Sequence, residues 1–324
     1  MSPTIGLLGD VMLGRGVARR LGEVAPERLW SDEVAALSAD CDAVICNLEC
    51  CISERASPTE CIPGKRFFFR APRAAVRALA AAGVRGVSLA NNHALDYGAE
   101  GLADTLAELS AAGIAAAGAG PDTERARRGT VVAAGEFRVG LLAVTDHPVE
   151  YAATQSSPGV ALADLTSGLP DWIPAELTRL RAETDAVVAF PHWGPNMTTK
   201  PTRLQRRGAR ALIDAGADLV AGHSAHVFHG IERIGGHFAL YDLGDALDDY
   251  AVDGRLRNDL GILTLWRPRG GPELEFVALR LGFCETTVAR GADADWIASR
   301  LAQACADLGT RVERVSEERL VAEP

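Results

Sequence analysis

The feature that most constrains the fold of this chain is an alternation of short aliphatic runs with segments of helical spacing. The runs, which predict buried strands, span residues 5–8, 43–46, 86–90, 131–134, 139–144, 186–190 and 219–221. The helical segments between several of them span residues 72–82, 99–112, 174–183 and 203–215, and Gly216 ends the last one. This alternation predicts a layered α/β fold.

After residue 230 the pattern changes to strand-like pieces without long helices between them. These pieces span residues 230–234, 237–241, 261–266 and 273–281, and we expect them to form antiparallel strands that close the sheets. Residues 293–308 predict a packing helix, and the charged tail at 313–324 is expected to be partly loose. With no repeat and no low-complexity linker, one domain is expected over residues 1–324, with a core at about 5–250.

Composition excludes two classes of partner. The formal charge of −10 argues against a nucleic-acid surface, which needs clustered Lys and Arg. The longest near-neutral run, residues 109–120, is too short to span a bilayer, so no membrane partner is expected. The chain enters an aliphatic run at Thr4 without a signal-peptide pattern, which predicts a cytoplasmic protein unless a leader precedes the given sequence. The oligomeric state is left open.

The cysteines do not have the paired spacings of a zinc site. The seven residues are Cys41, Cys46, Cys50, Cys51, Cys61, Cys284 and Cys305. They are expected to be reduced and mostly buried. A link between Cys51 and Cys61 is the alternative, which the redox conditions of the cytosol disfavour.

Polar residues follow five of the predicted strands directly. They are Asp10, Asn47, Glu49, Asn91, Asn92, His93, His192, His223 and His226. Ligands of open α/β sheets bind outside the carboxyl ends of the strands, so these side chains are expected to meet at one rim. Each residue alone is better explained as a turn or a satisfied polar group, and only the combination indicates a site. Carboxylate, amide and imidazole donors favour one or two divalent ions, Mn, Fe or Zn before Mg, and Glu49 is the natural bridge.

Several motifs, in the same order along the chain, resemble the CapA family, the poly-γ-glutamate capsule biosynthesis type of the calcineurin-like metallophosphoesterases. They are the segments 9–15 (GDVMLGR), 47–49 (NLE), 69–72 (FRAP), 88–98 (SLANNHALDYG), 192–194 (HWG), 216–218 (GAD), 222–227 (GHSAHV) and 241–245 (YDLGD). The resemblance runs from residue 5 to about 250, and its most specific part is the block 91–98.

The resemblance implies a four-layer α/β/β/α sandwich with a metal centre on one rim. Asp10, Glu49 and His226 would hold one ion, and the second would be held by Glu49, Asn92, His192 and His223. The position where the wider superfamily has a further His is Met12, and a thioether is a poor ligand for hard ions. One metal site is therefore expected to be weak or empty.

The resemblance also implies that His93 is the general acid or transition-state stabiliser, with Asp96 as its orienting carboxylate. The residues expected to contact the substrate are Arg15, Asn47, Arg70, Asn91, His147 and His229. A guanidinium offers two parallel donors to an anion, although Arg15 could equally pair with a carboxylate at the rim. For His147 and His229 a surface-loop role is an equal alternative.

Two further segments have structural explanations that we prefer to functional ones. Residues 65–69 (KRFFF) could belong to a lid, but a strand edge with a solvated basic start is preferred. The acidic residues Asp242, Asp245, Asp248 and Asp249 do not have the spacing of an EF-hand loop and are expected to form a solvated turn.

The sequence leads to three functional hypotheses. The first is a metal-dependent hydrolase, most favourably a phosphoesterase that acts on a small anionic metabolite through a metal-activated water. The second is cleavage or transfer at a γ-glutamyl amide. The third is a non-catalytic accessory protein of polymer synthesis, which His93 and Asp96 argue against and Met12 mildly favours.

Overall fold

The centre of the larger sheet consists of parallel strands, as the aliphatic runs predict. The structure is a computed structural model that describes residues 3–55, 57–269 and 273–322. The parallel strands, in spatial order, are β1 (Ile5–Val11), β2 (Ala43–Leu48), β5 (Val84–Ser88) and β6 (Ala115–Ala117). Every residue of β1 and β2 is buried, which is typical of parallel strands that are covered on both faces.

Antiparallel strands extend this sheet on the other side of β1. They are β16 (Leu260–Trp266), β17 (Leu274–Gly282), β18 (Glu285–Val288), β19 (Val312–Arg314) and β20 (Arg319–Ala322). The expectation of a partly loose tail is wrong for the described residues up to 322, because β20 pairs with β17. Leu320 and Ala322 are buried there and anchor the end of the chain. Residues 323 and 324 lie outside the described part.

The second sheet has six strands in the order β13-β14-β12-β11-β9-β8. Their bounds are β8 (Thr130–Ala134), β9 (Phe137–Thr145), β11 (Ala186–His192), β12 (Leu219–Ala221), β13 (Ile231–Ile234) and β14 (His237–Leu240). Antiparallel pairing after residue 230 is confirmed for β13 with β14. β14 also pairs with the earlier strand β12, and these two strands run parallel.

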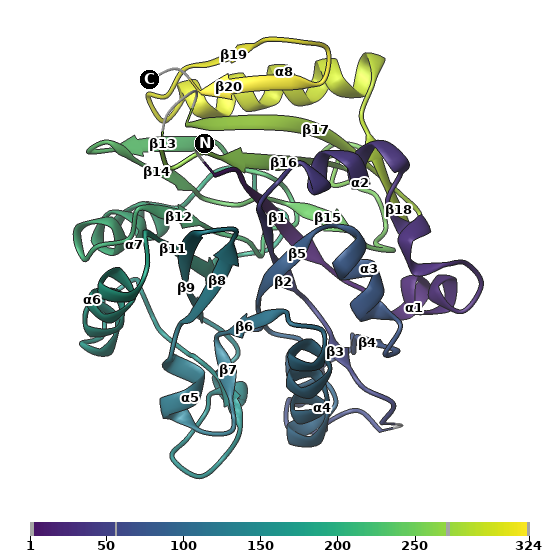
Figure 1. Cartoon of the computed structure of the whole chain (residues 1–324), viewed down its shortest axis with the longest axis vertical. Helices are drawn as coiled ribbons and strands as arrows, with labels where there is room; N and C mark the ends of the chain where they lie inside the picture. Colours follow the sequence, from purple (N-terminus) through teal and green to yellow (C-terminus); the bar gives the residue numbers. More distant parts are fainter. Residues whose placement is uncertain (1–2, 56, 270–272, 323–324) are drawn as a thin grey trace.

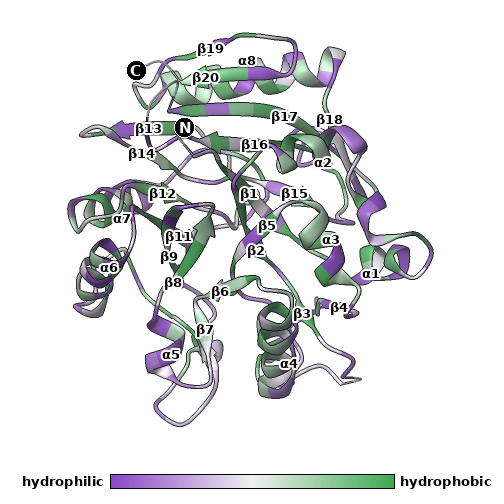
Figure 2. Cartoon of the chain, viewed as in Figure 1, coloured by the Kyte–Doolittle hydropathy of each residue, from purple (hydrophilic) through white to green (hydrophobic). Residues whose placement is uncertain are grey.

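Helices cover the outer face of each sheet and give four layers (Figure 1). The larger sheet is covered by α1 (Arg15–Leu21), α2 (Asp32–Ala39), α3 (Ala75–Ala81) and α4 (Gly98–Ala111). The second sheet is covered by α5 (Thr123–Arg127), α6 (Trp172–Glu183) and α7 (Arg203–Asp214). The inner faces of the sheets meet in a separate hydrophobic cluster. The α/β/β/α sandwich is therefore confirmed, and Figure 2 shows hydrophobic residues concentrated along the central strands.

Local signals explain where the predicted helices begin and end. At the start of α7 the Thr202 hydroxyl accepts a hydrogen bond from Gln205 N–H, and the Gln205 side chain accepts one from Thr202 N–H. Gly216, at φ 117°, follows this helix. The last helix, α8 (Gly291–Ala306), buries Ile297 and Leu301 in the cluster between the sheets and closes one end of the sandwich, at the top of Figure 1.

Short elements connect these layers near one rim. They are β3 (Cys51–Ile52), β4 (Arg70–Ala71), β7 (Ala119–Gly120), β10 (Gly159–Val160), β15 (Asp245–Leu247) and two 3-10 turns at Pro26–Leu29 and Val149–Tyr151. β15 pairs in parallel with β1 and places Asp245 opposite Asp10. The described residues of the stretches 50–69 and 146–172 carry only short pieces of regular structure.

Candidate metal centre

The carboxyl ends of strands from both sheets bring the predicted polar residues together. Asp10 lies near the end of β1, and Glu49 directly follows β2. His192 ends β11, and its backbone bridges to His223 beyond β12. The side chains of Asp10, Glu49, His192 and His223 are almost completely buried, so they form an enclosed site between the sheets.

Two groups of ligand atoms share Asp10. One group is Asp10, Glu49 and His226, and the other is Asp10, His192 and His223; within each group the atoms lie within 4.8 Å of one another. The Nδ1 atoms of His223 and His226 each lie 3.3 Å from a different oxygen of Asp10. The shared carboxylate in this geometry is thus Asp10, whereas the resemblance implied Glu49.

Unpaired polar atoms indicate that this site fits a cation. Asp10 Oδ2, Asn92 Oδ1 and His223 Nε2 are buried and have no hydrogen-bond partner among the described residues. Leaving such an atom unpaired costs about 1–3 kcal/mol, which a bound ion would offset. Carboxylate oxygens, an amide oxygen and imidazole nitrogens suit Mn, Fe or Zn. The donor set therefore fits a divalent metal.

Further side chains hold the candidate ligands in place. Asn47 Nδ2 donates to Asp10 Oδ1 over 2.8 Å, and Asn91 Nδ2 donates to Asn47 Oδ1 over 2.9 Å. Tyr250 donates its hydroxyl to Glu49 Oε2 over 3.0 Å. These contacts fix the ligand carboxylates before any ion binds, as outer contacts of metal sites do.

Burial and mutual charge shift the pKa values of the cluster strongly. Burial raises the pKa of Glu49 to about 8, with a further contribution from the charge of Asp10. Burial also acts to raise the pKa of Asp10, but the interactions of this carboxylate with His223 and His226 outweigh burial and hold its pKa well below the usual value. Burial also lowers the pKa of His192 well below its usual range, which leaves a neutral imidazole suited to a metal.

Met12 lies beside these ligands but faces the core. It is completely buried, and its Sδ accepts a hydrogen bond from Gly14 N–H at 3.0 Å. The Met12 sulfur thus accepts a backbone hydrogen bond. Because residue 12 is Met and not His, it supplies no imidazole to the ligand group that contains Glu49.

His93 and Asp96 form a hydrogen-bonded pair at the edge of the cluster. His93 Nδ1 lies 2.6 Å from Asp96 Oδ2, and the His93 ring stacks on Phe69 at 3.9 Å between centroids. Because the carboxylate is an acceptor, Nδ1 carries the proton and Nε2 is left for a substrate. Burial lowers the pKa of His93 to about 4, so the ring is neutral at pH 7.

Two residues that sequence reasoning did not assign to the site complete this pair. Lys65 Nζ lies 2.8 Å from Asp96 Oδ1, and the Tyr151 hydroxyl donates to the same oxygen over 3.0 Å. The preferred explanation of residues 65–69 as a strand edge with a solvated basic start is wrong at Lys65, because only 10% of this side chain is exposed. Both residues come from irregular stretches, where no local pattern indicates a partner.

A pocket of about 460 Å³ opens onto His93 and onto two of the candidate metal ligands, Asn92 and His226. Its wall includes His93, Asn92 and His226 together with Arg15, Phe67, Phe69, Asn196, Met197, Tyr250, Ala251 and Asn258. Arg15 lines this pocket, so its contact with a substrate anion stays a prediction. It also has the carboxylate partner of the alternative, since its Nε lies 3.3 Å from Asp249 Oδ1.

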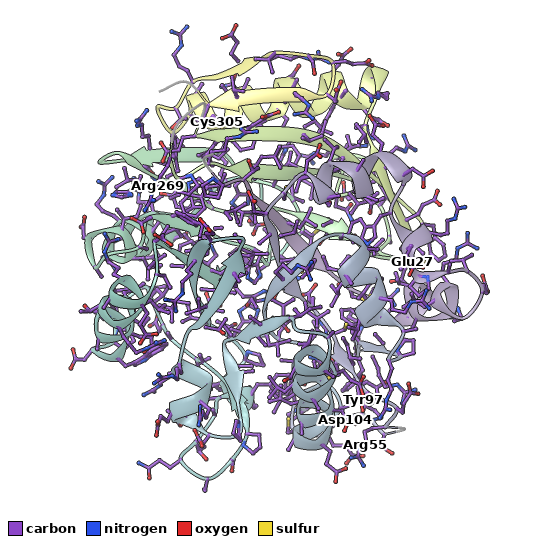
Figure 3. All side chains as sticks on the ribbon, in the orientation of Figure 1. Glu27, Arg55, Tyr97, Asp104, Arg269 and Cys305 are labelled. Carbon is purple, nitrogen blue, oxygen red and sulfur yellow. The ribbon has the colours of Figure 1, made fainter. Side chains whose placement is uncertain are left out.

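The other residues predicted to contact substrate lie elsewhere. Asn47 and Asn91 are fully buried beneath Asp10 and position it. Arg70 lies over the ring of Tyr97, which Figure 3 shows near Arg55 and Asp104 beside α4. His229 is buried and hydrogen-bonded to the carbonyl of Thr198. In the structure these four side chains thus contact other groups of the protein and not the pocket.

His147 lies close to the second group of ligands. Its ring centroid is 5.2 Å from that of His192, and its Nδ1 pairs with Asp146. Its side chain is 37% exposed. The contact of His147 with substrate thus stays a prediction. Its exposure and its place beside His192 permit such a contact.

The acidic residues after β14 are buried, so the expected solvated turn is wrong. Asp242, Asp245, Asp248 and Asp249 are each at most 9% exposed. Asp242 accepts hydrogen bonds from Ala225 N–H and Gly244 N–H, and Asp245 Oδ1 lies 2.8 Å from His226 Nδ1. These carboxylates organise the loop that carries His223 and His226.

The seven cysteines are free, as expected for reduced thiols. Cys51 is buried and Cys61 is exposed, so the alternative link between them is not formed. Burial raises the pKa of Cys51 to about 12, which keeps this thiol protonated.

The four-layer sandwich, with carboxylate, amide and imidazole groups gathered at the strand ends, defines a class of α/β/β/α proteins that carry a candidate metal centre at one rim. Within this class the chain belongs to the bacterial capsule synthesis protein PGA_cap family, whose model matches residues 4–250. The resemblance that the motifs carry is thereby confirmed.

Similar proteins have names that refer to polymer synthesis. A probable polyglutamine synthesis accessory protein of Mycobacterium tuberculosis is 32% identical over 95% of this chain and 93% of its own length. The PGA biosynthesis protein CapA of Bacillus subtilis is 29% identical over 75% of this chain and 62% of its own length. Among solved structures, a phosphatase of Mycoplasma pneumoniae covers 89% of this chain and 91% of its own, with a TM-score of 0.47 and 12% identity.

Within the described residues, no helix has both the length and the apolar character needed to cross a bilayer.

Proposed function

We propose that the protein is a metal-dependent phosphoesterase that acts on a small anionic substrate. The observation that carries the proposal is the pocket in which His93 Nε2 is available beside Asn92 and His226. The same pocket would expose a bound ester to the candidate metal ligands and to a proton-transferring group at once. We further propose that the protein works in the cytoplasm.

Asp10, Glu49 and His226 would hold one ion, and Asp10, His192 and His223 a second, with the amide of Asn92 as a further ligand. A bound divalent ion lowers the pKa of a water ligand and polarises a phosphoryl oxygen. Because His93 is neutral, it must take up a proton at Nε2 before it can pass one to a leaving oxygen. Asp96 orients the ring for this exchange and stabilises the imidazolium.

Arg15 would bind the anionic part of the substrate. Its Nε is engaged by Asp249, and its guanidinium carbon lies 5.7 Å from the ring centres of Phe67 and Phe69. This contact with rings and a carboxylate orders the side chain at the pocket wall, so little entropy is lost when an anion binds.

The second candidate function is cleavage or transfer at a γ-glutamyl amide. The names of the relatives, which refer to PGA biosynthesis and polyglutamine synthesis, favour it. The word "accessory" in one of those names also keeps a non-catalytic role as a third candidate.

A substrate screen separates these functions. The protein is loaded with Mn, Fe, Zn or Mg and assayed on phosphomonoesters, phosphodiesters and γ-glutamyl amides, with His93→Ala as the control. We expect phosphoester turnover that falls by about a hundredfold or more in His93→Ala. Turnover of amides alone would replace the proposal with the second candidate, and a metal-loaded protein without turnover of either class would favour the accessory role.

A further inference from the structure

The wall of the pocket is more apolar than the binding of a small, purely anionic metabolite requires. Phe67 is 59% exposed and Met197 is 37% exposed, although each is a large apolar side chain. The two residues come from segments far apart in the sequence, one before β4 and one after β11, and both line the pocket. Exposed apolar groups that meet at one site are typical of a binding surface.

Aromatic rings form the deeper part of the same wall. Phe69 is buried against the His93 ring, and its centroid lies 5.8 Å from that of Tyr250. Tyr250 also lines the pocket, and its hydroxyl is engaged by Glu49. The rings of Phe69 and Tyr250 therefore extend the apolar wall from the two exposed residues toward His93.

The charges around the pocket argue against a polyanion as the ligand. Among the residues that line it, Arg15 is the only Lys or Arg. Asp249 already partners Arg15, and the carboxyl groups of Asp242, Asp245 and Asp248 are buried nearby. A chain of repeated carboxylates would be repelled by these acidic groups and would find only one cationic side chain in the wall, whereas one phosphoryl group beside a ring would need only the metal centre and Arg15.

We propose that this pocket selects phosphoesters whose leaving group carries an aromatic ring, which packs between Phe67 and Met197. The proposal names the substrate class for the proposed function and rests on it. The phosphoryl group then lies at His93 and Asn92, while the ring covers the exposed apolar surface of the two loop residues. The ring adds affinity by removing apolar surface from water, on the order of tenfold in binding.

Binding of stable analogues tests the proposal without turnover. The metal-loaded wild-type protein, which cannot hydrolyse the P–C bond of a phosphonate, is titrated by calorimetry with phenylphosphonate, with methylphosphonate and with tri-γ-glutamate. We expect phenylphosphonate to bind about tenfold more tightly than methylphosphonate. Equal affinity for the two phosphonates, binding of neither phosphonate, or tightest binding of tri-γ-glutamate would each overturn the proposal.

Variants of the wall locate the preference. Phe67→Ser and Met197→Ser are each expected to reduce the ratio of the two phosphonate affinities by threefold to tenfold. Val315→Ser, at a similarly exposed apolar position between β19 and β20, is the control and should leave the ratio unchanged. A ratio that stays the same in both wall variants would overturn the proposal.

Failure of this proposal can be told from failure of the phosphoesterase function. If the wild-type protein hydrolyses aliphatic and aromatic phosphoesters with equal KM, the function holds and the aromatic preference is refuted. If it hydrolyses no phosphoester but the metal-loaded protein still prefers phenylphosphonate, the pocket is confirmed and the reaction is wrong.

Discussion

Lys65 Nζ lies 2.8 Å from Oδ1 of Asp96, the carboxylate whose other oxygen contacts His93 Nδ1. A lysine from an irregular stretch thus balances the buried charge that orients the proposed proton-transferring group. Lys65 Nζ also donates a hydrogen bond to the backbone carbonyl of Asn92 over 2.5 Å. It therefore links the Asp96 carboxylate to the residue that precedes His93. This contact makes the stability of the site depend on residues 50–69.

Replacing Lys65 by Met should destabilise the fold. The change leaves Asp96 buried without its ammonium partner, and such a loss costs about 3 kcal/mol in the free energy of unfolding. Lys200→Met is the matched control, because this side chain is 72% exposed in its pair with Asp307 and should change stability by less than about 1 kcal/mol. Urea denaturation measures both, and equal effects would refute the buried pair.

Asp10 should be needed for both metal ions. Because it belongs to both ligand groups, Asp10→Ala should lose all stoichiometric metal, whereas His192→Ala and His226→Ala should each weaken one site. Elemental analysis after dialysis counts the ions. His237→Ala is the control, since His237 contacts the carbonyl of Asp218 away from the centre. An unchanged metal content in Asp10→Ala would show that the carboxylate is not shared.

The phenol of Tyr250 should tune the affinity of the group that contains Glu49. Tyr250→Phe removes the hydrogen bond to Glu49 Oε2, and loss of such an outer contact weakens metal binding by about tenfold. Tyr241→Phe is the control, because that buried phenol donates to Glu232 instead. Calorimetric titration with Mn should separate the two variants, and equal affinities would assign Tyr250 a purely structural role.

His229 should make the fold less stable in mild acid. Burial lowers its pKa to about 4, below the ordinary value of 6.5. The unfolded chain thus binds the proton more readily than the folded one. The stability that the neutral His229 contributes is complete above pH 6.5 and is lost as the pH falls toward 4. In His229→Gln the free energy of unfolding should depend less on pH, by up to about 1.4 kcal/mol per pH unit within this window. Denaturation at pH 7.5 and pH 5 measures the difference, and parallel curves would contradict it.

Particular residues show how far the sequence alone could predict the fold. The aliphatic runs at 43–46 and 186–190 became β2 and β11 because parallel strands buried on both faces need continuous apolar residues. The tail was misjudged because β19 and β20 are short, and β19 has two charged residues among its three. They are held by pairing with β17, a long-range contact that local periodicity does not record.

The same limit applies to the candidate site. Its ligands were predictable because each follows a strand and because the motifs resemble one family. The burial of Asp245 and Asp248 was not predictable, since Asp residues in a row ordinarily indicate solvent. They are buried here because β15 pairs with β1 and brings this loop beneath His226.

The sequence by itself thus determined the α/β layers, the family and which side chains gather at the strand ends, because hydrophobic periodicity and motifs are local properties. Only the tertiary structure decided that Asp10 belongs to both groups of candidate ligands, that Lys65 pairs with Asp96 and that Phe67 and Met197 line the same pocket. Those relationships join segments that are distant in the chain, and their geometry exists only once the two sheets have packed against each other.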